Sequence, residues 1–399
     1  MSQRAIAQLL RDHRADLSWQ EACYQDLHQN PELSHHEVRT SAQVRARLQD
    51  MDCEIVDGIG GHGLVGILRN GDGPTVLFRA DMDALPVREA TGVPYASANG
   101  AMHACGHDVH TTAALGACAI LDAERDSWSG TFLALFQPAE ETSDGAQMMV
   151  SDGLVNRVPR PDVCLGQHVM PGPAGQVMSR PGPIMAGCDS IRITITGRSA
   201  HASMPHESVD PTLVAAMVIV RLQAVVAREV PPSEHFVISV GELHSGDKNN
   251  IIPATAELVL NTRFYKPELA ERVYRALRRV VEAECAASAC PVPPTFEFFA
   301  HGEVTNNSAA SDAVVRPVFD SIFGTASVTA TPAAVSEDFS YLPQAWGVPY
   351  YFWFIGCTPL NQLEAAPVNH QANFLPEYGP TMSAATLAAA AAALAYLVD

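Results

Sequence analysis

Two patterns of hydrophobic and polar positions alternate along the chain. Helical spacing predicts helices over residues 3–28 and 37–50, and the segments up to residue 183 add short, uninterrupted apolar runs. Such runs, alternating with helices, are typical of a parallel sheet buried on both faces. The pattern resumes after residue 300, with a helix near 308–322 and an alanine-rich terminal helix. We therefore predict a discontinuous, mainly parallel α/β domain formed by residues 1–183 and 301–399.

Three of the apolar runs end in side chains that can carry chemistry. "PTVLFRADMDALP" leads into Asp81 and Asp83, "GTFLALFQPAEE" into Glu140 and Glu141, and "PDVCLGQHVMP" into His168. In parallel sheets, ligands gather beyond the carboxyl ends of the strands. We therefore expect these side chains to lie together at one edge of the sheet.

Between the two segments the pattern becomes one of alternating apolar and polar positions. After the Pro/Gly-rich stretch 171–187, the order over residues 187–300 is strand, helix, two strands, helix and strand. This is the ferredoxin-like βαββαβ unit, with an antiparallel sheet covered on one face. Its free face or edge needs a partner, and a second copy of the unit is the simplest one. The sequence therefore predicts an inserted lid domain that forms a homodimer.

Composition narrows the class of protein. A net charge of −19 argues against nucleic-acid binding, and an anionic substrate would have to meet a local positive group. No uninterrupted apolar run reaches the eighteen or so residues of a membrane span, so we expect no membrane partner. The N-terminus lacks the features of a signal peptide, and the nine cysteines show no regular spacing, so we expect a cytoplasmic protein.

The stretch "AMHACGHDVHTT" gathers a thiol, several imidazoles and a carboxylate. Cys105 and His107 lie two apart, so their side chains face the same way in an extended segment. Three interpretations are open: a metal site, a Cys–His nucleophile oriented by Asp108, or buried residues without chemistry. Thiolate and imidazole are preferred zinc ligands, and the other strand ends can supply the missing ones. Metal binding is therefore favoured.

The adjacent Glu140 and Glu141 can divide two tasks between them. In a loop after Pro138, one carboxylate can bind metal while the other turns toward water as a general base. The alternative is a pair of solvated acids on a turn. Combined with Cys105 and the histidines, the pair favours a site for two divalent cations about 3.5–4 Å apart.

Nine motifs, in order along nearly the whole chain, resemble those of the co-catalytic zinc aminoacylase and carboxypeptidase family. Within it they are similar to hippurate hydrolases, amino-acid-conjugate hydrolases and bacterial aminoacylases, of which the acyl-glutamine aminoacylases are nearest. The stretches are "HQNPELSHHE", "FRADMDALPV", "MHACGHDVHTT", "FQPAEE", "QHVMP", "SAHASMPH", "NNIIPATAEL", "NTRF" and "SEDFSYL".

The resemblance implies a role for each matching residue. Glu140 would be the general base, and Asp83 would orient a ligand or the base. In the lid, His201 would polarise the scissile carbonyl, in cis or from a partner subunit, while Asn250 and Arg263 would grip the substrate carboxylate. The implied ligands of the two metals are Cys105, His107, Glu141, His168 and His370.

The chain departs from the wider family at three places, two among the candidate metal residues and one in the lid. Asp81 stands where the family has His, and Cys105 stands where it has Asp. The thiol softens the site and favours zinc, with manganese, cobalt or nickel as alternatives. The lid motif begins "GRSAH" instead of the double-glycine form, which leaves the conformation of the loop before His201 open.

The expected function is that of a metal-dependent amidohydrolase. It would release a carboxylic acid and a free amino acid from an N-acyl amino acid, using water activated by the metals and deprotonated by Glu140. A dipeptidase or carboxypeptidase could use the same site. A thiol hydrolase and a non-catalytic binder of amino-acid conjugates are the rivals from other classes.

Overall fold

The computed structural model describes residues 2–398 and divides into two compact units. Unit 1 comprises Met1–Ile184, Asn306–Thr331 and Asp338–Asp399, and unit 2 comprises Met185–Thr305 and Pro332–Glu337. The sequence did not assign the last of these segments to the insertion. Hydrogen bonds explain its place, because the Ala186 N–H donates to the carbonyls of Ala333 (3.1 Å) and Val335 (3.0 Å).

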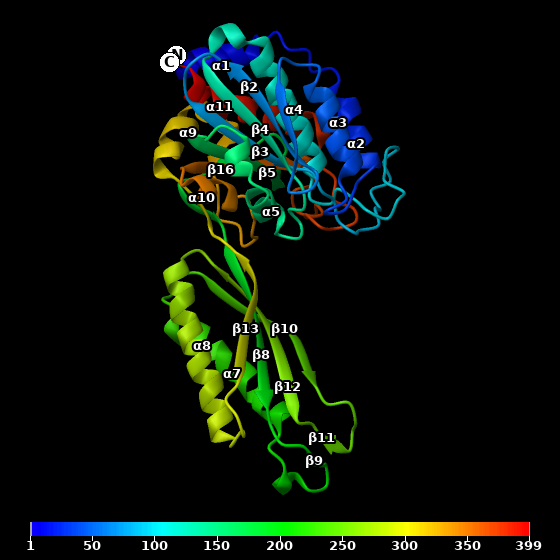
Figure 1. Ribbon diagram of the computed structural model, residues 1–399, viewed down its shortest axis with the longest axis vertical. Coiled ribbons are helices and arrows are strands. Elements are labelled where there is room, and N and C mark those ends of the chain that lie inside the picture. The colour runs from blue at the N-terminus through cyan, green and yellow to red at the C-terminus, as the bar shows by residue number, and fades with distance from the viewer. Residues whose placement is uncertain (1, 399) are drawn as a thin grey trace. The chain divides into compact units, whose positions relative to one another are not determined.

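Unit 1 is built on a mixed, mainly parallel sheet in the order β1-β2-β4-β3-β5-β16-β6-β15 (Figure 1). The strands β3, β4, β5 and β16 at its centre are parallel, whereas β1, β2 and β6 run antiparallel to a neighbour. The strand bounds are β1 Glu54–Ile59, β2 Gly63–Asn70, β3 Thr75–Asp81, β4 Gly130–Gln137, β5 Val163–Pro173, β6 Val177–Ser179, β15 Ser327–Thr329 and β16 Tyr350–Thr358.

The central strands are apolar because both of their faces are covered. Every residue of β4 is buried, and so are all but the first of β16. Helices α4 and α11 pack together against the sheet, with α9 beside α11, while α5 and α10 contact β4 and β5 respectively. The bounds of these helices are α4 His107–Ala123, α5 Gly145–Ser151, α9 Ala309–Phe323, α10 Tyr341–Trp346 and α11 Tyr378–Leu397.

The N-terminal region differs from the prediction of one helix over residues 3–28. It contains α1 (Gln3–Arg11) and α2 (Gln20–Gln29), followed by α3 (Val38–Leu48). The break is a turn in which the Ser18 N–H donates to the Asp16 carboxylate (2.9 Å). An Asp side chain that satisfies the backbone two residues on competes with helix formation, and this explains the interruption.

Unit 2 has the predicted βαββαβ order with an antiparallel sheet, β10-β12-β8-β13 (Figure 1). Helices α7 and α8 pack against each other and against the sheet. A short ladder of β9 with β11 extends from it. The bounds are β8 Gly187–Thr196, β9 Ala200–His201, α7 Pro211–Glu229, β10 Phe236–Ser245, β11 Ile251–Ile252, β12 Thr255–Phe264, α8 Pro267–Ala287 and β13 Thr295–Gly302.

Among the described residues, two helices, α7 and α11, are long and apolar enough to cross a membrane by length and composition, which the sequence did not predict. The apolar composition of α11 follows from its place in the fold, since 72% of its apolar stretch is buried inside unit 1. Only 33% of the corresponding apolar stretch of α7 is buried. The core position of α11 therefore accounts for its composition, and α7 keeps an exposed apolar face.

Candidate metal centre

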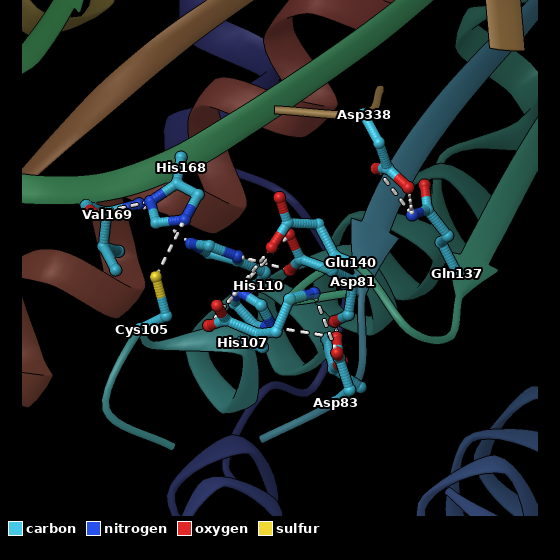
Figure 2. A network of polar contacts seen from close by, with 12 residues as sticks. Asp81, Asp83, Cys105, His107, His110, Gln137, Glu140, His168, Val169 and Asp338 are labelled. Atoms are coloured by element: carbon cyan, nitrogen blue, oxygen red, sulfur yellow. Dashed lines mark hydrogen bonds and ion pairs between the residues drawn. The ribbon is translucent and has the colours of Figure 1, made fainter. Parts of the chain in front are cut away.

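Four potential metal ligands converge at the carboxyl edge of the unit 1 sheet. The Cys105 Sγ lies 3.4 Å from the His168 Nε2 and 3.3 Å from the His370 Nε2 (Figure 2 labels the first pair). The His370 Nε2 is also 3.4 Å from a Glu141 carboxylate oxygen. These residues come from the turn before α4, from β5, from the loop before α11 and from the loop after β4. The fold thus gathers side chains separated by up to 265 residues.

His107, the first residue of α4, faces the carboxylates of Glu140 and Glu141. Its Nε2 lies 3.8 Å from oxygens of both Glu140 and Glu141, too far for hydrogen bonds. The His107 Nε2 and the Glu141 Oε1 are buried without a hydrogen-bond partner among the described residues. Buried polar atoms are rarely left unpaired, so these two atoms need a ligand.

The donor set fits two cations that share Glu141. The ligand atoms of Cys105, Glu141 and His370 lie within 4.8 Å of one another, and so do those of His107, Glu140 and Glu141. Thiol, imidazole and carboxylate are the groups that zinc and related divalent metals take in proteins. The five predicted ligands are therefore placed together, with His168 beside Cys105.

Burial sets the protonation of this centre. It raises the pKa of the Cys105 thiol well above its ordinary range, and it raises the pKa of Glu141 to about 7. A cysteine nucleophile needs a lowered pKa, so the thiol-hydrolase interpretation is not supported. A metal ligand must lose its proton, and cation binding here would release protons.

Asp83 holds two parts of the centre. Its Oδ2 accepts hydrogen bonds from the Ser34 hydroxyl (2.7 Å) and the Glu141 N–H (3.0 Å), while its Oδ1 lies 3.3 Å from the His107 Nδ1. A proton on Nδ1 would leave the His107 Nε2 lone pair free for a cation. This geometry suits a residue that orients a ligand, which is the role predicted for Asp83.

Residues with positive φ orient the backbone next to the candidate ligands. Gly106 has φ 82°, and a Cβ there would lie 2.3 Å from the Val169 side chain, so only glycine fits between Cys105 and His107. Ala139 and His370 also have positive φ, 54° and 72°. Such strain in residues other than glycine collects at functional sites.

Asp108 has a different partner from the one considered for it. It does not orient the Cys105–His107 pair, because its carboxylate accepts a hydrogen bond from the His28 Nδ1 (2.7 Å). The other ring nitrogen of His28, Nε2, lies 3.1 Å from a Glu89 carboxylate oxygen. Burial lowers the pKa of His28, but the hydrogen bonds and charges of Asp108 and Glu89 outweigh it and raise the pKa to about 9. This buried network fixes α2 to the start of α4 and was not predicted.

The predicted catalytic residue His201 and the predicted substrate-binding residues Asn250 and Arg263 lie in unit 2, with the first two beyond the start of β12 and Arg263 near its end. His201 and Asn250 are exposed on the β9–β11 ladder, where the Ala202 N–H donates to the Asn250 carbonyl (3.0 Å). Arg263 is paired in register with Cys188, near the start of β8, and donates to the Ser336 hydroxyl (2.8 Å). Thr255 and Arg263 are eight residue steps apart along the strand, or roughly 26 Å. Within one protomer, Arg263 therefore does not meet His201 and Asn250.

Comparisons with known proteins agree with this centre. Residues 77–392 match the model of peptidase family M20/M25/M40. "N-acetylcysteine deacetylase" of Bacillus subtilis is 34% identical over 344 residues, covering 83% of this chain and 86% of that protein. "IAA-amino acid hydrolase ILR1-like 4" of Arabidopsis thaliana is 34% identical over 345 residues, covering 85% and 77%.

A third relative and one solved structure extend the comparison. "Thermostable carboxypeptidase 2" of Saccharolobus solfataricus is 34% identical over 357 residues, covering 88% of this chain and 89% of that protein. The crystal structure of the Bacillus subtilis YxeP protein, described as a dinuclear metal binding peptidase of the M20 family, has a TM-score of 0.80, 28% identity and coverage of 96% and 99%. The chain therefore belongs to peptidase family M20/M25/M40 and is a metal-dependent amidohydrolase.

Proposed function

We propose that this protein hydrolyses the amide bond between an acyl group and the α-nitrogen of an amino acid. The observation that carries the proposal is a buried carboxylate, Glu140, placed beside the unpaired Nε2 of His107 in a cluster that fits two cations. Relatives named as an N-acetylcysteine deacetylase and an IAA-amino acid hydrolase support the choice of substrate class.

The residues of the chain divide the work. Cys105, His107, Glu141, His168 and His370 would hold the metals, which when bound supply Lewis-acid chemistry that lowers the pKa of water and polarises the carbonyl. Glu140 takes the proton of the attacking water and later delivers it to the leaving nitrogen. Arg263 suits the carboxylate of the amino acid, because two N–H groups of its planar guanidinium can bind both carboxylate oxygens. Its positive charge also offsets, locally, the net charge of −19.

We further propose zinc as the metal and the cytoplasm as the location. The thiol in the ligand set favours zinc over manganese. All nine cysteines are free in the structure, which suits a reducing compartment.

The substrate class is tested by comparing acyl amino acids with dipeptides on the zinc-loaded protein. We expect kcat/KM to be at least about tenfold higher for acyl amino acids, a difference of about 1.4 kcal/mol in transition-state binding. The same acyl amino acids with their carboxylate converted to an amide serve as the control for recognition by Arg263. A preference for dipeptides would instead support the carboxypeptidase alternative, which the Saccharolobus relative favours.

A homodimer formed through unit 2 would bring Arg263 of one protomer and His201 and Asn250 of the partner subunit to the same substrate. Among the described strands, the edge strand β10 pairs with β12 alone. Helix α7 exposes Leu213, Met217 and Val220 by 62%, 45% and 64%. These positions, four and three residues apart, lie on one helix face. A second copy would cover this face in an isologous contact, and His201 and Asn250 of the partner subunit would complete a site that Arg263 begins.

Replacing both Leu213 and Val220 with Glu is expected to convert the dimer into a monomer, because two charges would be buried at the contact. Sedimentation analysis measures the mass. Hydrolysis should fall with it while metal content stays constant, since the ligands all lie in unit 1. Ala283→Glu, at an exposed position of the other helix of unit 2, α8, is the matched control. An active monomer would exclude a contribution from the partner's His201.

A further inference from the structure

His110 lies inside the metal centre, yet both of its ring nitrogens are already engaged. It is buried, its Nδ1 lies 2.6 Å from the Asp81 Oδ1, and its Nε2 accepts the Val169 N–H at 2.8 Å. A backbone N–H can only donate, so Nε2 must be the unprotonated nitrogen. The proton of the neutral ring is therefore on Nδ1 and is donated to Asp81. The tautomer of His110 follows from its partners.

The bond to Val169 controls the neighbouring ligand. His168 donates its Nδ1 proton to the Val169 carbonyl (2.7 Å), and this turns its Nε2 toward the Cys105 Sγ (Figure 2). The His110 ring also packs edge-on against the His168 ring, with centroids 4.5 Å apart. His110 therefore fixes both the backbone and the ring on which the direction of the His168 lone pair depends.

Asp81 is itself held by a buried ionic network. Its second oxygen accepts from Arg79 (2.7 Å), which also donates to Asp338 (3.1 Å) and to the Gln137 side-chain carbonyl (2.8 Å). Asp338 in turn accepts from the Gln137 amide and from the Ala146 N–H (2.9 Å). The network connects the ends of β3 and β4 with the first turn of α5. Through His110 it reaches Val169 within β5.

We propose that His110 is a positioning residue that transmits this network to His168, and that it is not a metal ligand. Ligand atoms of Asp81, His107, His110 and His168 do lie within 4.8 Å of one another, a spacing that could suggest a further cation site. The two hydrogen bonds leave no lone pair of His110 for a cation. The inference rests on the proposed dinuclear centre, and its principal readout is metal binding without substrate.

Two amide variants separate the two bonds of His110. The side-chain oxygen of Gln can occupy the position of Nε2 and accept the hydrogen bond from the Val169 N–H. The side-chain amide of Asn can occupy the position of Nδ1, so this variant keeps only the hydrogen bond to Asp81. We expect His110→Gln to bind two metals with nearly the affinity of the wild type. His110→Asn should bind two metals about 10–100-fold more weakly, the effect of losing an outer-shell partner. Titration against a chromophoric chelator measures the number of metals and their affinities.

The outcomes are distinguishable. The loss of one metal in both variants would make His110 a ligand, and equal affinities in the two variants would remove its positioning role. Either result overturns the proposal. If wild-type protein binds two metals but hydrolyses no acyl amino acid, only the proposed function fails. A crystal structure of the metal-loaded wild type is the readout without a substitution, and a cation about 2.1 Å from the His110 Nε2 would contradict the inference.

Discussion

Glu140→Gln is expected to lower kcat for acyl amino acids by about 10²–10⁴-fold, the range of general acid–base catalysis. The amide has nearly the shape of the carboxylate but cannot take a proton from water. Glu140 is buried in the loop after Pro138 and lies 3.8 Å from the His107 Nε2, so the substitution removes the proposed base from the centre. Steady-state kinetics and metal analysis of the same preparation measure the effect, and two bound metals are expected.

The neighbouring position supplies the matched control. Glu141→Gln changes the same group one residue away, but Glu141 lies 3.4 Å from His370 and is shared by both candidate cation groups. We expect this variant to lose metal, whereas Glu140→Gln keeps it. An undiminished rate in metal-loaded Glu140→Gln would exclude Glu140 as the base.

Cys105→Ala is expected to remove the largest part of the metal affinity. The Sγ is the atom that lies within 3.4 Å of both His168 and His370, so its loss leaves two imidazoles without their common neighbour. The reduction in affinity should exceed the roughly 10–100-fold typical of outer-shell partners. Cys118→Ala, at a buried position in α4, is the control and should lower stability without changing the metal content.

Cys105→Asp refines this expectation, because a carboxylate can also bind two cations. It should keep two metals but shift the preference from zinc toward manganese, since the donor is harder. Metal competition measured by elemental analysis gives the ratio. A Cys105→Ala protein that keeps two tightly bound metals would show that the thiol is not a ligand.

The parts of the fold that the sequence predicted are those with a local pattern. Buried runs such as "GTFLALFQ" have no polar position to expose, so they indicate a sheet covered on both faces, and the predicted α/β class is confirmed. The strand-end rule also explains why Asp83 and Glu140, which follow β3 and β4, both lie beside His107, although their roles stay predictions. His168 differs from the prediction, because it lies within β5 and not at its end. The helix predicted over residues 3–28 was wrong, because its periodicity did not register the turn at Asp16.

The interactions that could not be predicted join distant residues. Arg79 and Asp338 are 259 residues apart, and no spacing rule connects them. The partner of His110 is a backbone N–H, which every residue except proline offers, so the sequence carries no signal for it. Asn250 and Arg263 are close in sequence, yet a single extended strand holds them far apart. That separation follows from the length of β12, Thr255–Phe264, and appears only in the structure.

The central claim is that two cations lie among Cys105, His107, Glu141, His168 and His370. Anomalous diffraction from crystals of the zinc-loaded protein tests it most directly. The account predicts two peaks about 3.5–4 Å apart, with Cys105 in contact with at least one of them and His110 with neither. No peak in this cluster, or a single peak that Cys105 does not touch, would contradict it.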